Sequence, residues 1–147
     1  MKILYIDMDN VLVDFTSALK FVDEKTKEIY KSRLDEIPGI FSLMKPMPNA
    51  IKSYEILSKK FDTYILSTAP WHNSSAWGDK LEWVQKYLGN LAYKRLILTH
   101  HKNLNLGDYL VDDRLKNGAS EFKGEHIHFG KEPFFSWDEV AQYLLAK

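Results

Sequence analysis

The stretch ILYIDMDNVLVDF, residues 3–15, places two carboxylates, Asp7 and Asp9, directly after four largely apolar residues. A short apolar run of this kind predicts a strand that is buried on both faces. Alternate side chains of an extended chain point the same way, so Asp7 and Asp9 share one side at the end of this strand while Met8 turns away. Folding alone does not require two acids at that place, which makes both of them candidates for a chemical role.

Further along the chain, short apolar runs alternate with segments of helical periodicity. A capping-box pattern, Ser136 to Glu139, opens the last helical segment, and Gly89 can end the one before it. This alternation predicts an α/β fold, a Rossmann-like open parallel sheet with helices on both faces. The expected strands are Ile3–Ile6, Thr63–Leu66, Arg95–Leu98, Tyr109–Val111 and His126–His128. The expected helical stripes are Phe15, Leu19, Val22 and Ile29; Ala50, Tyr54 and Leu57; Trp77, Leu81, Val84 and Leu88; and Val140 and Leu144.

The length of 147 residues fits a single domain, residues 1–147. Within it, residues 15–48 form a long and mostly helical stretch, which no expected strand interrupts before the sequence Pro46-Met47-Pro48. We interpret residues 15–48 as a small helical cap, inserted after the first strand and lying over one end of the sheet. A long crossover between two strands is the alternative interpretation.

Charge and composition exclude several classes of partner. Twenty basic and twenty acidic residues give a net charge of zero, which argues against non-specific binding to a nucleic-acid polymer or a membrane and leaves small molecules. The absence of cysteine excludes disulfides and thiolate metal sites. The apolar run at the N-terminus stops at Asp7, which is too short for a signal peptide or a membrane helix, so we expect a cytoplasmic protein.

Polar and charged residues follow three of the other expected strands. Because ligands gather at the carboxyl ends of the strands in open α/β sheets, we expect these residues at one edge, together with Asp7 and Asp9. Carboxylates are hard oxygen ligands for Mg²⁺, and hydroxyls and cations bind phosphoryl oxygens; so many acids without a metal would cost stability. The residues are Ser67 and Thr68 after the second strand, Lys102 after the third, and Asp112, Asp113 and Arg114 after the fourth.

Taken singly, each of these features has a structural explanation as a turn, a helix cap or a solvated surface charge. Their joint occurrence at the strand ends favours a functional site. Two other uses of paired acids fit the sequence poorly. A calcium-binding EF-hand loop starting at Asp7 would need glycine and glutamate where the chain has Leu12 and Ala18. A phospho-accepting receiver domain would have its acidic pair after the first strand and its lysine last, which is the wrong order for this chain.

Four motifs in this order resemble those of the haloacid dehalogenase superfamily of phosphotransferases. They are Asp-x-Asp-x-Val at residues 7–11, a Ser/Thr after the second strand, a lysine and an acidic pair. Within that superfamily, residues 3–117 resemble the 5′(3′)-deoxyribonucleotidases. The stretches that carry this resemblance are DMDNVLVDF (7–15), PGIFSLMKPMPNA (38–50), STAPW (67–71) and VDDR (111–114).

The resemblance implies a Mg²⁺-dependent reaction in which Asp7 attacks phosphorus and forms an aspartyl-phosphate. Asp9 then protonates the leaving oxygen and later deprotonates the hydrolytic water. Mg²⁺ is held by Asp7, the Asp9 carbonyl and the acidic pair, with Asp113 in direct contact and Asp112 behind it. Without this ion, an anionic nucleophile would be repelled by an anionic phosphate.

The resemblance also implies how the phosphoryl group is held. Lys102 offsets the negative charge on Asp7 and on the phosphoryl group. Thr68, together with Ser67, hydrogen-bonds a phosphoryl oxygen, and Arg114 binds phosphate.

The base of a nucleotide would lie between aromatic rings. Phe15 and Phe41 match the ring positions that sandwich the base in this group, and stacking on phenylalanine suits a pyrimidine. The alternative for Phe15 is that it is the first core residue of its helix. Trp71 and Trp77 either wall the pocket or pack against other side chains.

From the sequence we expect a Mg²⁺-dependent phosphatase of small phosphate monoesters, most specifically a 5′(3′)-deoxyribonucleotidase acting on deoxyribonucleoside monophosphates. The alternatives are a phosphatase of another small metabolite and a catalytically silent module that binds Mg²⁺ and phosphate as a regulator. Asp7 and Asp9 count against the silent module, because binding alone needs neither a nucleophile nor an acid–base group. The expected partner is a small phosphate monoester, with no nucleic-acid polymer and no membrane, and the protein is expected to be a monomer or homodimer.

Overall fold

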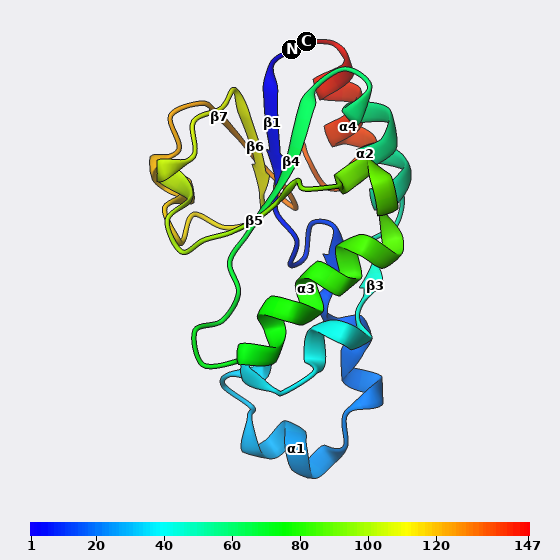
Figure 1. Ribbon diagram of the computed structural model, residues 1–147, viewed down its shortest axis with the longest axis vertical. Helices are drawn as coiled ribbons and strands as arrows, with labels where there is room; N and C mark the ends of the chain where they lie inside the picture. The colour runs from blue at the N-terminus through cyan, green and yellow to red at the C-terminus, as the bar shows by residue number, and fades with distance from the viewer.

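The computed structural model describes residues 1–147 and is built on a five-stranded parallel sheet (Figure 1). The strands, in sheet order, are β5 (Leu96–Leu98), β4 (Asp62–Ser67), β1 (Ile3–Ile6), β6 (Tyr109–Asp112) and β7 (Glu125–His128). At the centre, Tyr5 of β1 pairs with Tyr64 on one side and with Leu110 on the other. The chain moves outward from β1 through β4 to β5 and then returns to the other side for β6 and β7. The strand order therefore reverses at β1, and open α/β sheets bind ligands at such a point.

Three α-helices cover one face of the sheet, namely α2 (Ala50–Ser58), α3 (Ser74–Tyr87) and α4 (Trp137–Leu145) (Figure 1). The helix α4 is fixed to the loop after β1, because the buried indole of Trp137 donates a hydrogen bond to the Val11 carbonyl at 2.7 Å. The helix begins where the capping-box pattern predicts, with Ser136 as its N-cap, but the Ser136 hydroxyl donates to the Glu139 carboxylate instead of accepting from a backbone amide. None of the helices combines the length and the apolar character needed to cross a membrane.

The other face of the sheet is covered by short 3-10 helices and loops. The helix η6 (Ala119–Glu121) and the neighbouring Phe122 pack on Tyr5, and η5 (Lys102–Leu104) lies beside η6. The connections that form this layer, residues 99–108 and 113–124, leave little room for a typical α-helix of about 11–12 residues with a turn at each end. All five expected strands are present, so the predicted α/β class is confirmed, with α-helices on one face and 3-10 helices on the other.

The helical stripe expected between residues 15 and 29 does not form one helix. The first part is a 3-10 helix, η1 (Phe15–Phe21), and the second is a short α-helix, α1 (Glu24–Ile29). They are separate because the Asp23 carboxylate accepts a hydrogen bond from the Thr26 amide at 2.7 Å and thereby caps a new helix. Ile29 consequently faces solvent and not the core.

Residues 15–44, here called the helical lobe, lie beyond the carboxyl ends of the strands (Figure 1). After η1 and α1, the lobe continues with η2 (Leu34–Glu36) and η3 (Ile40–Leu43). Its two ends are joined by a two-stranded antiparallel sheet of β2 (Val13–Asp14) and β3 (Lys45–Pro46). The lobe therefore leaves the core and returns to it at one place.

A buried amide fastens the helical lobe to the start of α3. The side-chain nitrogen of Asn73 donates to the carbonyls of Asp35 and Ile37, at 2.9 and 3.1 Å. Its oxygen accepts from the Ser75 hydroxyl at 2.6 Å, and that hydroxyl accepts from the Gly39 amide at 2.9 Å. These four bonds fix residues 35–39 of the lobe relative to the loop that follows β4.

Candidate active site

The carboxyl ends of three neighbouring strands bring polar side chains to one edge of the sheet. Asp7 follows β1, Asp112 ends β6 and Ser67 ends β4. The Asp7 amide donates to the Val111 carbonyl at 2.9 Å, which continues the pairing of β1 with β6 by one residue. The backbone itself therefore places the Asp7 carboxylate beside that of Asp112.

A buried lysine joins these two carboxylates. Lys102 donates from Nζ to Oδ1 of Asp7 at 3.0 Å and to Oδ2 of Asp112 at 2.5 Å. Burial by itself would lower the pKa of Lys102, but the charges of Asp7 and Asp112 outweigh it and raise the pKa, so this lysine stays charged. The Lys102 amide donates to the Asn117 carbonyl at 2.7 Å. This close approach needs Gly118, whose φ is +83° and where a Cβ would lie 2.9 Å from the Lys102 nitrogen.

Three carboxylates converge next to this lysine. One oxygen from each of Asp7, Asp112 and Asp113 lies within 4.8 Å of the others. Burial, followed by the charge of Asp7, raises the pKa of Asp112 to about 6, and burial with the charges of Asp7 and Asp112 raises the pKa of Asp113 to about 7. Oδ1 of Asp113 is buried and has no hydrogen-bond partner. An unpartnered carboxylate oxygen within a set of hard oxygen donors fits a divalent cation such as Mg²⁺.

Asp9 lies against a second buried lysine, Lys80 of α3. Lys80 is fully buried and donates to Oδ1 of Asp9 at 3.1 Å and to the Ser67 hydroxyl at 2.8 Å. Its Nζ also lies 4.6 Å from the centre of the Phe41 ring. Although the Asp9 side chain is 28% exposed, the surrounding protein removes enough water that burial raises its pKa, against the opposing charge of Lys80. Lys80 thus holds Asp9 in position and limits the rise in its pKa.

Two adjoining hollows lie over the clustered carboxylates and Asp9. The first, of about 90 Å³, is lined by no hydrophobic residue, and its wall consists of Asp7, Asp9, Asp35, Thr68, Pro70, Lys102, Asp112, Asp113, Arg114, Lys116 and Asn117. The second, of about 330 Å³, shares Asp9, Asp35 and Arg114 with the first and adds Phe15 and residues 31–34 of the lobe. The first has room for a phosphoryl group and a cation, and the second has room for a larger substituent on that phosphate.

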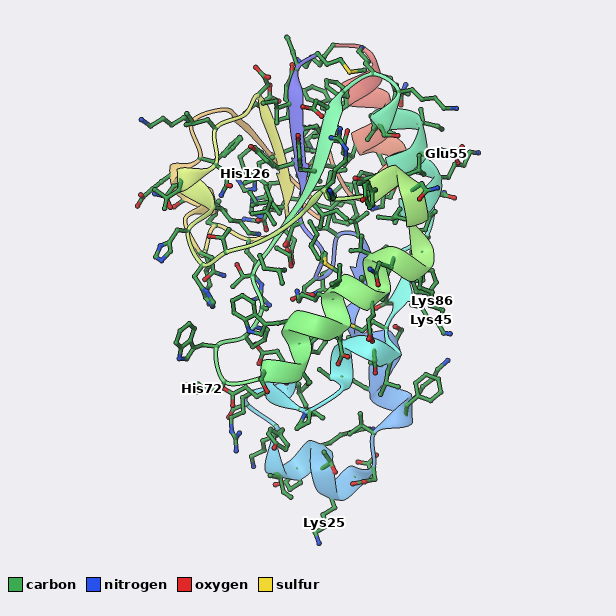
Figure 2. The ribbon with its side chains drawn as sticks, viewed as in Figure 1. Lys25, Lys45, Glu55, His72, Lys86 and His126 are labelled. Atoms are coloured by element: carbon green, nitrogen blue, oxygen red, sulfur yellow. The ribbon has the colours of Figure 1, made fainter.

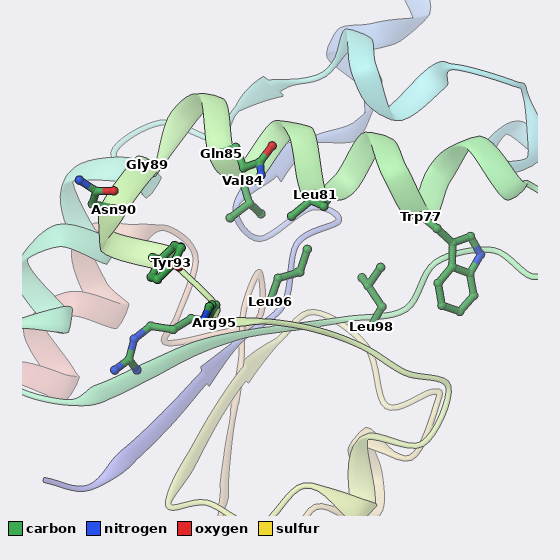
Figure 3. Close-up of a pocket in the computed structure, with 12 residues that line it drawn as sticks. Trp77, Leu81, Val84, Gln85, Gly89, Asn90, Tyr93, Arg95, Leu96 and Leu98 are labelled. Atoms are coloured by element: carbon green, nitrogen blue, oxygen red, sulfur yellow. The ribbon is translucent and has the colours of Figure 1, made fainter.

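The largest hollow, about 670 Å³, lies elsewhere, between α3 and β5 (Figure 3). Its wall includes Trp77, Leu81, Leu96 and Leu98, and none of the clustered carboxylates reaches it. Size alone therefore does not locate the chemistry of this protein.

A family model described as "5′ nucleotidase, deoxy (Pyrimidine), cytosolic type C protein" matches residues 18–144. The chain belongs to this family. The match begins after Asp7 and Asp9, so membership of this nucleotidase family does not depend on those two carboxylates.

Individual relatives agree with this family. The chain is 59% identical over 145 residues to a protein of Vibrio phage KVP40 designated a candidate 5′(3′)-deoxyribonucleotidase, with 99% of this chain and 85% of that protein covered. It is 31% identical over 157 residues to the human "5′(3′)-deoxyribonucleotidase, cytosolic type", covering 84% and 77% of the two chains. A haloacid dehalogenase-like hydrolase from Xanthomonas campestris has the same fold, with a TM-score of 0.58, 10% identity and coverage of 99% and 96%. The predicted nucleotidase family and the predicted class of phosphoric monoester hydrolase are confirmed, and the fold is the one found in a haloacid dehalogenase-like hydrolase.

Two predicted phosphate ligands of this nucleotidase site differ in position. The Thr68 side chain lines the first hollow, where its hydroxyl donates to the Thr99 carbonyl at 2.7 Å. Ser67 does not line it, because its hydroxyl is buried behind Asp9 as an acceptor for Lys80. The hydroxyl predicted to bind substrate therefore holds Lys80 in this structure and lies outside the wall of the hollow.

The predicted base sandwich between Phe15 and Phe41 is not formed. Their ring centres are 5.9 Å apart at an angle of 78°, so the two rings contact each other edge to face and leave no slot for a base. Phe41 is only 2% exposed and belongs to the core beneath Lys80. Phe15 is partly exposed and lines the second hollow, so it alone can meet a substituent held there.

The two tryptophans lie outside both hollows of the site. Trp71 and Trp77 pack against the His100 ring, with centres 5.9 and 6.1 Å away. Of the two alternatives given by the sequence, packing against other side chains is the one observed.

Lys80 is the residue of the site that sequence reasoning missed. The predicted stripe of α3 ran through Trp77 and Leu81, yet the side chains buried in the helix are Ala76, Lys80, Trp83 and Val84. Leu81 is 46% exposed. The signal was a lysine in register with small and aromatic residues on the buried face, four positions from Ala76 and three from Trp83.

Proposed function

We propose that the protein is a Mg²⁺-dependent phosphatase that hydrolyses deoxyribonucleoside monophosphates through an aspartyl-phosphate. The observation that carries the proposal is the convergence of Asp7, Asp112 and Asp113 around Lys102 in a small hollow without hydrophobic lining. Burial and neighbouring negative charge raise the pKa values of Asp112 and Asp113, and acids perturbed in this way are typical of active sites. Membership of the nucleotidase family supports the same chemistry.

The chain can hold Mg²⁺ through Asp7 and Asp113, with Asp112 and the Asp9 carbonyl completing the site. When bound, the ion would supply positive charge between the nucleophile and the phosphate. Asp7 is the nucleophile, because it belongs to the carboxylate cluster and the Lys102 ammonium group holds its Oδ1 in place. Lys102 also keeps a positive charge where the charge of the phosphoryl group develops.

Asp9 acts as the general acid and base. Burial raises its pKa, and a carboxyl group with a raised pKa retains a proton nearer neutral pH and can give it to the leaving oxygen. After the alcohol has left, the same carboxylate can take a proton from water that attacks the aspartyl-phosphate. Lys80 directs Oδ1 of Asp9, so the other oxygen is available for this transfer.

The second hollow supports a nucleoside as the leaving group. It adjoins the phosphoryl site, and Phe15 offers one aromatic ring for a base. The relatives named as 5′(3′)-deoxyribonucleotidases support deoxyribonucleotides, and the human one is of the cytosolic type, which supports a cytoplasmic location. A second candidate, a phosphatase of another small phosphorylated metabolite, is favoured by the exposed charged side chains Lys31, Arg33 and Asp35 in the same wall.

A panel assay tests the proposal. Phosphate release is measured from deoxyribonucleoside and ribonucleoside 5′- and 3′-monophosphates and from an aryl phosphate, each with Mg²⁺ and with EDTA. The proposal expects release that EDTA abolishes and that is fastest for deoxyribonucleotides. Activity on the aryl phosphate alone would replace the substrate assignment by the second candidate. No turnover of any compound would indicate a silent binding module.

A further inference from the structure

Two histidines of the edge strand β7 contact the loop that carries the acidic pair. His126 and His128 are two residues apart, so their side chains lie on the same face of β7, and their rings stack with centres 5.3 Å apart at 28°. His128 pairs in register with Asp112, the last residue of β6. Figure 2 labels His126, which lies among the strands on the side away from the helical lobe.

Each imidazole bonds a backbone carbonyl of the acidic pair. Nε2 of His126 lies 3.1 Å from the Asp112 carbonyl oxygen, and Nε2 of His128 lies 2.9 Å from that of Asp113. A carbonyl oxygen only accepts, so both rings carry their proton on Nε2. The Asp112 carbonyl has a second donor, the Phe129 amide at 3.0 Å. For the Asp113 carbonyl, His128 is the only protein donor.

The bond from His128 fixes one peptide plane. The peptide between Asp113 and Arg114 has its carbonyl bonded to His128 and its N–H bonded to Oδ1 of Asp112 at 3.0 Å. With both sides engaged, this peptide cannot rotate. Its orientation decides where the Asp113 side chain leaves the backbone, and Asp113 is the carboxylate with an unpartnered buried oxygen.

We propose that His128, assisted by His126, is a positioning residue that holds the acidic loop in the conformation that binds the cation. The inference rests on the Mg²⁺ site of the proposed function. Three clustered carboxylates, two of them buried, repel one another, and a loop held only by its own chain would relax outward in the absence of the ion. Two hydrogen-bond donors from β7 oppose this relaxation without competing for the carboxylate oxygens. Outer partners that orient metal ligands typically contribute 10–100-fold in metal affinity.

The test compares two substitutions that differ by one methylene. In His128→Gln the side-chain amide nitrogen extends about as far as Nε2 of the imidazole, whereas in His128→Asn it is too short to reach the Asp113 carbonyl. His126→Asn removes a donor from a carbonyl that keeps the Phe129 amide. His72→Asn is the matched control, because His72 is exposed in the loop before α3 (Figure 2). Binding of MgCl₂ alone is measured by titration calorimetry, at a temperature where melting curves show every variant folded.

The expected dissociation constant for Mg²⁺ rises about tenfold or more in His128→Asn and less in His126→Asn. It stays within about twofold of the parent in His128→Gln and His72→Asn, and kcat at saturating Mg²⁺ changes little in all four. Unchanged Mg²⁺ affinity in His128→Asn, or equal losses in the Asn and Gln variants, would overturn the inference. If the parent releases no phosphate yet His128→Asn binds Mg²⁺ more weakly, the proposed function fails and the inference stands. If the parent is active and His128→Asn binds Mg²⁺ normally, only the inference fails.

Discussion

Replacing Lys80 by methionine tests the ion pair on which the acid–base group depends. Methionine has a similar length and fits beside the Phe41 ring, but it removes the donor to Asp9 and to the buried Ser67 hydroxyl. Removing one partner of a fully buried ion pair costs about 3–5 kcal/mol. The Asp9 side chain is 28% exposed, and water can replace part of the lost bond. We therefore expect unfolding free energy to fall by about 2–4 kcal/mol at neutral pH, or roughly 5–15 °C in Tm.

The loss of unfolding free energy in Lys80→Met should depend on pH, in a direction fixed by the pKa of Asp9. Burial raises the pKa of Asp9 and Lys80 opposes that rise, so the Lys80→Met variant has an Asp9 of still higher pKa. A carboxyl group whose pKa is higher in the folded state binds protons more strongly there, and stability falls as pH rises from its unfolded value through its folded value. The deficit relative to the parent should therefore be smallest at acidic pH, where Asp9 is protonated in both proteins, and largest at alkaline pH, where it is ionised in both.

Thermal melts of both proteins across this pH range provide the measurement, and Lys86→Met, an exposed lysine of the same helix (Figure 2), is the control. The other acids of the site are common to both proteins and cancel in the difference. Equal deficits at both ends of the pH range would refute the pairing of Lys80 with Asp9. A deficit no larger than that of Lys86→Met would refute the burial argument itself.

Three further substitutions test other parts of the site. Asp7→Asn should leave the fold intact and reduce turnover of an aryl phosphate by more than about a thousandfold, and a smaller loss would exclude Asp7 as the nucleophile. Phe15→Ala should raise KM for nucleotides by roughly tenfold and leave KM for an aryl phosphate unchanged. Phe41→Ala, which truncates a core side chain, should instead lower the unfolding free energy by about 3–5 kcal/mol. A KM effect confined to Phe41→Ala and a stability loss confined to Phe15→Ala would disprove our placement of the rings. Gly118→Ala should lower both Tm and activity, because a Cβ there meets the backbone of Lys102 at 2.9 Å. Gly89→Ala, also at positive φ but in open space, should lower Tm only slightly, and equal losses of Tm in the two variants would contradict the steric argument at Gly118.

The sheet and its acidic edge were predictable because the signals are local. Each strand is a short apolar run, and parallel strands bring whatever follows them to one edge regardless of the connections. Asp7, Lys102 and Asp112 therefore meet as the sequence indicates, although they are far apart in the chain.

The residues between the strands were harder to predict, because their environment is set by packing of distant segments. Nothing near Lys80 in the sequence reveals that its ammonium group lies against the Phe41 ring of the lobe or that it bonds Asp9. The predicted sandwich of a base between Phe15 and Phe41 is not formed for a similar reason. Both rings are apolar, and their contact with each other removes apolar surface from water. The break at Asp23 was readable in principle, as an acid three positions before Thr26 is a helix cap.

The pairing of β2 with β3 has a consequence for protein engineering. Val13 faces Pro46 and Asp14 faces Lys45, so the two ends of the helical lobe are adjacent. Residues 15–44 of a relative can therefore be joined to the sheet through two adjacent junctions, provided that the new segment keeps an apolar side chain against Lys80, as Phe41 does here. Asn73 would have to be exchanged with it, because its amide grips the lobe backbone. Chimeras built on this plan would keep one hydrolytic apparatus and vary the leaving group that it accepts.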